Sequence, residues 1–155
     1  MPPKVSNPRD LLLQLLGEAL YVERRLVGGV LRDLIDAVRD EELRAALEQH
    51  LEQTRTHVEL AETAFRALEA APTANRSADF EAAVAAHDDL AGSIVEPRLA
   101  DLFHAQTALR TEHLEIALYT AILALGFDDA LAPLRESLAD EVEAREMLER
   151  LLRRA

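Results

Sequence analysis

The stretch PTANRSADFEAAVAAHDDLAGSIVEP, residues 72–97, lies between two longer helical segments and decides how they can be arranged. Proline is disfavoured inside helices, so Pro72 ends the segment before it, whereas Pro97 suits the first position of the helix that follows. Between them, Ser77 can cap a shorter helix that fades near Gly92. A connection of about 25 residues with its own helix can run the length of a bundle. We therefore expect a crossover that carries the chain from one end of the molecule to the other.

Upstream of the crossover, the pattern predicts two long amphipathic helices. The pair Asn7-Pro8 combines a capping side chain with proline at the first helical position, and it predicts a helix over residues 8–38. A tight turn near Asp40 precedes a second helix that continues to residue 70. Because this turn is short, the two helices should form an antiparallel hairpin. The pair Gly28-Gly29 inside the first helix indicates a bend or a close helix approach.

Downstream of the crossover, a second pair of helices is expected. The first begins at Glu96-Pro97 and runs to residue 125, and a short turn over residues 127–129 leads into the last helix. Pro133 interrupts that last helix early, and Arg153-Arg154 complement its negative end. Two antiparallel hairpins joined by one long crossover predict an all-α, ferritin-like four-helix bundle with a short extra helix. We expect a single domain over residues 1–155.

Composition agrees with a helical bundle and argues against several kinds of function. Ala and Leu dominate, 49% of the residues are apolar, 30% are charged, and aromatic residues are few. The net charge of −12 argues against nucleic-acid binding and against docking on an anionic membrane, since both depend on Lys and Arg. The absence of cysteine excludes disulfides and thiolate metal sites.

Localisation is expected to be cytoplasmic. The Met-Pro-Pro-Lys start lacks the apolar core of a signal peptide. The longest apolar run, residues 116–125, is too short for the ~20 residues that a membrane-spanning helix requires. We therefore expect a soluble protein without a membrane partner.

Glu23 lies at the centre of the apolar stripe of the first helix. At about 100° per residue, its neighbours on that face are apolar, and they include Leu12, Leu16, Ala19, Leu26, Val27, Val30 and Leu34. Glu141 has the same setting on the last helix, among Leu134, Leu138, Leu148 and Leu152. An unpaired buried charge costs on the order of several kcal/mol. Both carboxylates therefore indicate a polar site inside the bundle.

The two middle helices also direct polar groups inward. His50 and His57 both lie within about 60° of Thr54, the centre of the apolar face of the second helix. One interior histidine is usually a hydrogen-bonded core residue, and two on one face, seven positions apart, strengthen the case for a ligand role. On the third helix, carboxylates three positions apart can bridge metals, although most such pairs are simply solvated. The candidate metal ligands are therefore Glu23, His50, His57, Glu112, Glu115 and Glu141. Histidine and carboxylate together suit iron or manganese and, less well, zinc.

Arg145 supports an alternative in which the polar core holds no metal. It lies one turn after Glu141 on the same face, and its guanidinium can pair with a carboxylate but cannot ligate a cation. Arg145 with one or two protonated histidines would nearly cancel the charges of Glu23, Glu112 and Glu141. In this alternative the chain is a non-catalytic structural or interaction protein.

Three segments resemble the YciF-type stress-protein family of the ferritin-like superfamily. LGEALYVERRL (16–26) is similar to the family's first-helix motif L-x-D-x-Y-x-A-E-x-x-L. HLEQTRTH (50–57) resembles H-L-E-E-T followed by Gln or His three residues on, and EHLEIALY (112–119) resembles E-H-Y-E-I-A-x-Y. The resemblance covers nearly the whole chain. It implies a ferritin-like bundle with a crossover helix, commonly dimeric and linked to bacterial stress responses, without a defined biochemical activity.

The wider superfamily builds a di-iron site from Glu, Glu-x-x-His, Glu and Glu-x-x-His on four successive helices. By this resemblance, the implied ligands are Glu23, His57, Glu112 and Glu141. Thr54 stands in place of a glutamate, Ala144 in place of a histidine, and Arg145 in place of the family's usual acidic residue. One metal position would thus have lost most of its ligands. These departures argue against a working di-iron oxidase and leave a partly degenerate metal site, or none.

The third helix is apolar on two faces, although the core of a four-helix bundle needs only one. The second face is a contiguous patch of the kind that soluble monomers avoid, formed by Leu114, Leu118, Ile122 and Leu125. The short crossover helix can cover part of it. We expect a homodimer, since twofold interfaces are the commonest closed assemblies and the resemblance implies the same state.

Overall fold

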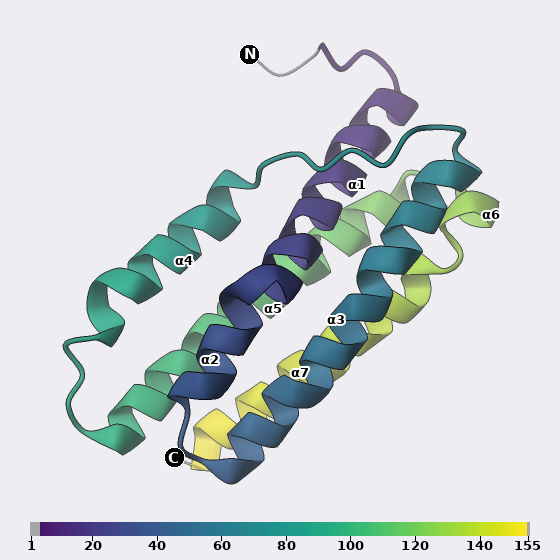
Figure 1. The fold of residues 1–155 in the computed structure, drawn as a ribbon. Helices are drawn as coiled ribbons and strands as arrows, with labels where there is room; N and C mark the ends of the chain where they lie inside the picture. Colours follow the sequence, from purple (N-terminus) through teal and green to yellow (C-terminus); the bar gives the residue numbers. More distant parts are fainter. Residues whose placement is uncertain (1–3, 155) are drawn as a thin grey trace.

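The computed structural model describes residues 4–154, and the expectations that concern residues 1–3 and 155 lie outside this range. The described residues form helices joined by turns and linkers, without a β-strand (Figure 1). The first hairpin comprises α1 (Pro8–Arg25), the π-helical segment η1 (Leu26–Val30), α2 (Leu31–Ala37) and α3 (Glu41–Ala67). The crossover carries α4 (Ala78–Ala91). The second hairpin comprises α5 (Pro97–Ala124), α6 (Asp128–Leu131) and α7 (Leu134–Arg154).

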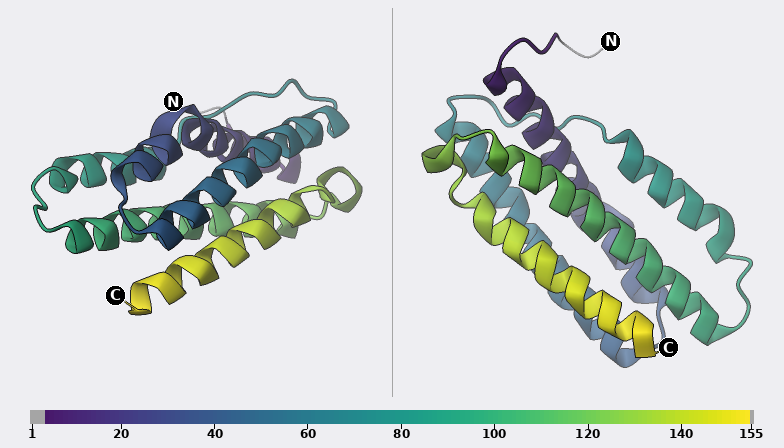
Figure 2. Two further views of the ribbon diagram at one scale, coloured as in Figure 1. Left: turned by 60° about the horizontal axis from the view of Figure 1, so that its bottom comes forward. Right: turned by 180° about the vertical axis from the view of Figure 1, so that it is seen from behind.

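The four long helices close into a bundle. Helix α1 packs against α3 and α5, and α7 packs against the same two helices from the other side. Helix α4 lies outside this arrangement, alongside α5 (Figure 2). The crossover leaves the end of α3 and brings the chain to the opposite end of the bundle, where α5 begins (Figure 1). This is the ferritin-like arrangement, and it confirms the fold expected from the sequence.

Side-chain caps fix the beginnings of the main helices. The Asn7 carboxamide accepts a hydrogen bond from the Asp10 amide at 2.9 Å, and Asp40 accepts one from Leu43 at 2.8 Å. Ser77 caps α4 and Glu96 caps α5 in the same way. Each such cap stabilises a helix by about 1 kcal/mol. The caps expected at Asn7 and Ser77 are therefore confirmed.

The glycine pair in the first helix marks a bend. Residues Leu26–Val30 form a π-helical turn, and Gly29 has non-helical backbone angles (φ 165°, ψ −34°). A π-turn inserts an extra residue into an α-helix and commonly produces a kink. The long helix expected over residues 8–38 is therefore divided into α1, η1 and α2.

The crossover linker passes directly over α1 at Gly17. The Asn75 amide donates a hydrogen bond to the Gly17 carbonyl at 2.9 Å. A Cβ atom at position 17 would lie 2.3 Å from Asn75 Nδ2 and 2.7 Å from the Thr73 carbonyl oxygen. Glycine is therefore required here by the close approach of the two segments, which fixes the path of the crossover.

Helix α4 is tied to α1 by a polar network as well as by apolar packing. Glu81 accepts hydrogen bonds from Arg25 Nε at 2.6 Å and from the Tyr21 hydroxyl at 2.8 Å. The Arg25 guanidinium lies 5.9 Å from the centre of the Phe80 ring, which is fully buried. Arg25 and Tyr21 lower the pKa of Glu81 to about 2.

The second apolar face of the third long helix is largely buried within the chain. Leu118 is 7% exposed and Ile122 is 0% exposed, and Leu114 and Leu125 pack against the core. The reason is that α5 packs against α4 as well as against α1 and α7. The expectation that this face forms a free surface patch is therefore wrong, and the dimer that it supported stays a prediction.

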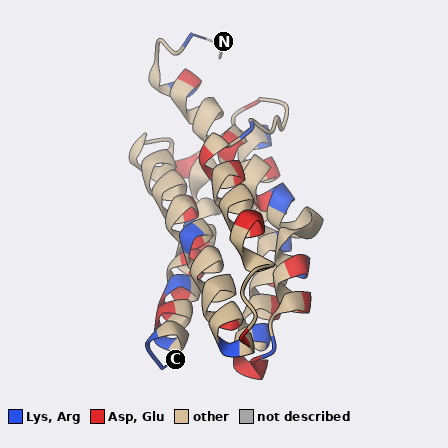
Figure 3. Cartoon of the chain, turned by 90° about the vertical axis from the view of Figure 1, so that its left-hand side faces the viewer, with Lys and Arg blue, Asp and Glu red and all other residues tan. Residues whose placement is uncertain are grey.

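Two surface properties accompany this fold. Within residues 4–154, every helix is too short or too polar to cross a bilayer. Acidic residues appear along the length of the helices in the view of Figure 3, with Lys and Arg interspersed among them. The side of the molecule in this view therefore does not carry a continuous basic surface.

Candidate metal centre

All six candidate ligands from the sequence meet in the middle of the bundle. Glu23 comes from α1, His50 and His57 from α3, Glu112 and Glu115 from α5, and Glu141 from α7. Glu23, His57 and Glu141 are 0% exposed, Glu112 and Glu115 are 1% exposed, and His50 is 5% exposed. The structure thus brings together the residues that helical phasing directed inward and the two carboxylates, Glu112 and Glu115, that it placed on a flank.

Three of these residues form the first cluster. His57 Nδ1 lies 2.9 Å from Glu141 Oε1 and 3.5 Å from Glu23 Oε2. Three ligands from three different helices can hold one face of a cation, because their free lone pairs converge on one point. This cluster joins α1, α3 and α7.

Four residues form the second cluster. His50 Nε2 lies 2.7 Å from Glu112 Oε1 and 3.8 Å from Glu141 Oε2. Glu115 completes the cluster, in which one ligand atom from each residue lies within 4.8 Å of the others. The second cluster therefore draws on α3, α5 and α7.

Glu141 belongs to both clusters and divides its two oxygens between them. Oε1 faces His57, and Oε2 is the atom nearest to His50. A carboxylate placed in this way can bridge two cations, and paired metal sites in proteins lie about 3.5–4 Å apart. The geometry therefore fits two adjacent metal positions rather than one.

Most polar side-chain atoms of the centre lack a hydrogen-bond partner within residues 4–154. Each of the six residues has at least one buried side-chain oxygen or nitrogen without a partner among residues 4–154. The contact of 2.7 Å between His50 Nε2 and Glu112 is thus close but does not have hydrogen-bond geometry. Two ligands at right angles on bonds of about 2.1 Å lie about 3 Å apart. Short contacts between buried ligand atoms that lack hydrogen-bond geometry are compatible with a cation between them, so these residues fit a metal.

Two further side chains position the ligands. Asp140 Oδ2 lies 2.9 Å from His57 Nε2, and the Tyr119 hydroxyl donates to Glu23 Oε1 at 3.2 Å. A metal-binding histidine usually donates its second N–H to a carboxylate in this way. Asp140 is a site residue that the sequence pattern did not single out. Its position next to Glu141, at the edge of the inward face of α7, was the available signal.

Without a metal, protons balance the charge of the centre. Burial alone lowers the pKa of His50, but the carboxylates of Glu112, Glu141 and Glu23 outweigh burial and raise this pKa to about 10. Burial also lowers the pKa of His57, but the nearby carboxylates of Glu141 and Glu23 outweigh burial and raise this pKa to about 11. Both imidazoles are therefore protonated at neutral pH.

The carboxyl groups respond in opposite directions. Burial raises the pKa of Glu115 well above its usual range, and the nearby carboxylates of Glu141 and Glu23 raise it further. Burial also acts to raise the pKa of Glu141, but its contacts with Glu112 and His57 outweigh burial and lower this pKa to about 2. Burial also raises the pKa of Glu112 well above its usual range, against the opposing charge of His50. The centre therefore holds protons on His50, His57, Glu112 and Glu115 that a cation would displace.

Arg145 does not neutralise the centre. Its ion pairs among residues 4–154 are with Glu146 and Glu149, both at 3.7 Å, and its side chain is 30% exposed. The sequence placed Arg145 on the same face as Glu141, but its long side chain turns toward its own helix surface. The expectation of charge balance through Arg145 is therefore wrong, and His50 and His57 take that role.

Thr54 occupies the position where the superfamily pattern has a glutamate. It is fully buried, and its hydroxyl donates to the His50 carbonyl at 2.7 Å. His50, one turn earlier on α3, and Glu115 on α5 supply donors to the second cluster. The second position therefore retains four candidate ligands, although the superfamily pattern predicted that it had lost most of them.

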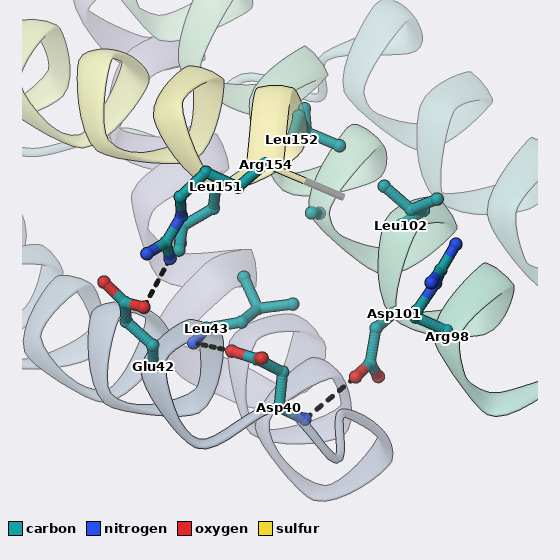
Figure 4. Close-up of a pocket in the computed structure, with 10 residues that line it drawn as sticks. Asp40, Glu42, Leu43, Arg98, Asp101, Leu102, Leu151, Leu152 and Arg154 are labelled. Carbon is teal, nitrogen blue, oxygen red and sulfur yellow. Dashed lines mark hydrogen bonds and ion pairs between the residues drawn. The ribbon is translucent and has the colours of Figure 1, made fainter.

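A larger cavity lies at the end of the bundle and is distinct from this centre. It has a volume of about 370 Å³ and lies between the α2–α3 turn, the start of α5 and the end of α7 (Figure 4). The carboxylate of Asp101 accepts a hydrogen bond from the Asp40 amide at 2.8 Å. The Asp40 side chain caps α3 by accepting a hydrogen bond from the Leu43 amide, and Arg154 forms an ion pair with Glu42. These contacts join the helix ends, so we assign this cavity a structural role.

The fold and the buried carboxylate–histidine centre define a ferritin-like helical-bundle protein. The chain belongs to the DUF892 family, a domain of unknown function, whose profile matches residues 7–155. The comparison with curated proteins gave no significant match.

Three solved structures are similar to this chain. YcfI from Rhodopseudomonas palustris has 26% sequence identity and a TM-score of 0.91, with 96% of this chain and 97% of that chain covered. The E. coli stress protein YciF has 23% identity and a TM-score of 0.88, with 96% of each chain covered. A two-domain protein from Anabaena variabilis, with DJ-1/ThiJ/PfpI-like and ferritin-like domains, has 21% identity and a TM-score of 0.66. This last match covers 96% of this chain and 37% of that one. The expected resemblance to the YciF-type family is confirmed.

Proposed function

We propose that this chain is a ferritin-like, stress-associated protein that binds a pair of divalent metal cations in the middle of its bundle. The observation that carries the proposal is the Glu141 carboxylate, whose two oxygens face two clusters of buried donors without hydrogen-bond partners. Burying four carboxyl groups and two imidazoles is costly unless a ligand or protons compensate for their charge. A bound cation pair accounts for both the charge and the missing partners.

The donor set favours iron or manganese. It offers carboxylate oxygens and imidazole nitrogens, and the chain has no cysteine that could supply a thiolate. Oxygen-rich sites with few imidazoles suit manganese and iron, whereas structural zinc sites are usually built from four Cys or His ligands. A pair of such metals would supply Lewis-acid or redox chemistry when bound. Glu23, His57 and Glu141 would hold one cation, and His50, Glu112, Glu115 and Glu141 the other.

The surroundings of the centre favour metal binding over turnover of an organic substrate. Its residues are at most 5% exposed, so a large molecule would not reach them in this conformation. Asp140 and Tyr119 hold His57 and Glu23 in place and keep the ligand atoms of those residues directed inward. A role in metal binding during stress is in keeping with the similarity to the E. coli stress protein YciF.

Elemental analysis of protein purified without a metal-affinity tag tests this proposal. Wild-type protein should retain close to two equivalents of iron or manganese per chain. Glu141→Gln should lose both, because it removes the shared ligand, whereas Glu115→Gln should mainly affect the second cluster. Glu136→Gln, which neutralises an exposed carboxylate on α7, is the matched control. Equal, substoichiometric metal in wild type and Glu141→Gln would refute the proposal.

A second candidate function is a metal-free structural or interaction protein. The raised pKa values of His50 and His57 favour it, because protonated imidazoles can balance the buried carboxylates without a cation. The same elemental analysis separates the candidates. Protein that folds normally and takes up no added Mn²⁺ would support this second function.

A further inference from the structure

The buried centre approaches solvent on one side. His50 is 5% exposed, whereas the other five candidate ligands are at most 1% exposed. His50 also lines a hollow of about 10 Å³ between α3 and α7. A space of this size has room for about one water molecule. The hollow therefore connects the surface with a candidate metal ligand.

Small or flexible side chains border this hollow. Ala144 on α7 follows Glu141 by three positions, on the helix face that borders α3, and Ala46 lies on the α3 side. Met147 adds an unbranched side chain that can change rotamer at low cost. The remaining lining residues are polar and can solvate a cation on its way inward, namely Gln49, Gln53 and Glu143.

The two histidines differ in how firmly they are held. Asp140 fixes His57 through its Nε2 atom at 2.9 Å. His50 Nδ1 is buried and has no hydrogen-bond partner within residues 4–154. Rotating the His50 ring would therefore break no hydrogen bond at Nδ1, whereas rotating His57 would break its contact with Asp140. The less restrained ligand is the one beside the hollow.

From this geometry we propose that divalent cations reach the centre through the hollow between α3 and α7, with His50 as the first ligand of the centre that they meet. This inference rests on the proposed function, since it concerns the route to the same metal positions. Glu143, exposed at the mouth, attracts the cation, and Met147 moves aside to let it pass. His50 releases its proton to solvent as it binds the cation, and it then passes the cation to the carboxylates of Glu112 and Glu141.

The test measures the rate at which metal-free protein takes up Mn²⁺, by stopped-flow competition with a fluorescent Mn²⁺ indicator. Ala144→Leu fills the hollow without removing a donor, and should slow uptake about tenfold, the effect of about 1.4 kcal/mol added to the barrier. Met147→Ala widens the hollow and should accelerate uptake. Ala139→Leu, an exposed substitution of the same kind on α7, should leave the rate unchanged. The Mn²⁺ stoichiometry at equilibrium should be the same in all four proteins.

The possible results separate this inference from the proposed function. If wild-type protein binds no Mn²⁺ at equilibrium, the proposed function fails and the route fails with it. If wild-type protein and both hollow variants bind Mn²⁺ fully and at equal rates, the metal centre stands and the route is refuted. Should Ala144→Leu fail to fold, the rate of Met147→Ala decides: acceleration supports the route, and an unchanged rate overturns it.

Discussion

Asp140 and His57 form a carboxylate–imidazole contact at the edge of the buried centre, with 2.9 Å between Asp140 Oδ2 and His57 Nε2. With Nε2 engaged by Asp140, Nδ1 of the same ring is directed toward Glu141 and Glu23. Asp140 therefore sets the orientation of a candidate metal ligand without itself facing the metal position.

Asp140→Asn should weaken metal binding while leaving the fold intact. The loss of an outer carboxylate typically lowers metal affinity about 10–100-fold. Competition titration with Mn²⁺ measures this change, and Asp89→Asn, an exposed substitution on α4, provides the control. An affinity equal to that of wild type would mean that Asp140 does not position His57 for a metal.

The stability of the metal-free protein should fall as the pH rises. The folded pKa values of His50 and His57, about 10 and about 11, lie above the ordinary value of 6.5. A raised pKa contributes stability that is fully present below pH 6.5 and is lost as pH rises through the folded values. The raised pKa values of Glu112 and Glu115 act in the same direction, with their contributions present below pH 4.5. Glu141 acts oppositely, and its contribution is lost only as pH falls toward about 2.

Thermal melts between pH 6 and 10 check this prediction, with and without Mn²⁺. Because the cation replaces the displaced protons, added Mn²⁺ should stabilise the protein more strongly at high pH. A melting temperature of the metal-free protein that rises over this range would contradict the proton balance.

Arg145→Leu should have a small effect on stability. Arg145 is partly exposed and makes ion pairs of 3.7 Å with Glu146 and Glu149, a class of interaction that contributes about 0–1 kcal/mol. Removal of one partner of a buried ion pair would instead cost about 3–5 kcal/mol. Thermal melts with and without chelator distinguish the two cases. A large loss of thermal stability that occurs only in the presence of chelator would mean that Arg145 is the partner of the buried carboxylates.

Self-association as a homodimer stays a prediction, but its structural basis changes. Because α5 packs against α4, α1 and α7, its second apolar face is largely buried. Apart from Val5 and Leu11 near the start of the chain, the exposed large apolar side chains of residues 4–154 lie at and near the turn between α4 and α5. They are Leu90 (49% exposed), Val95 (93%) and Leu99 (52%). Light scattering at micromolar concentration should give twice the 17.2 kDa chain mass. Val95→Asp should shift the mass toward that of the monomer, and a wild-type mass of 17.2 kDa would refute the dimer.

The architecture was predictable because the signals that set it are local. Pro72, Ser77 and Pro97 punctuate the crossover, and the helices around it begin at capping residues recognisable in the sequence. Helical phasing also directed Glu23, Glu141 and the two histidines inward, because it gives the direction in which each Cβ projects. It placed Glu112 and Glu115 only on the flank of an apolar face.

Helical phasing could not predict where the end of a long side chain lies, or how many other helices pack against a given helix. Arg145 projects toward the face of Glu141, yet its guanidinium turns to Glu149 on the next turn of its own helix. Asp140 lies at the edge of that face and still contacts His57 from α3. The second apolar face of α5 required knowledge of where α4 packs. Each of these features depends on tertiary contacts that spacing along one helix does not encode.

The most direct test of the two-metal centre is anomalous diffraction from crystals grown with Mn²⁺. Two anomalous peaks are expected about 3.5–4 Å apart, one on each side of the Glu141 carboxylate. The first should lie between Glu23 and His57, and the second between His50 and Glu112. If crystals grown with Mn²⁺ show no anomalous peak beside Glu141, the proposed two-metal centre is contradicted.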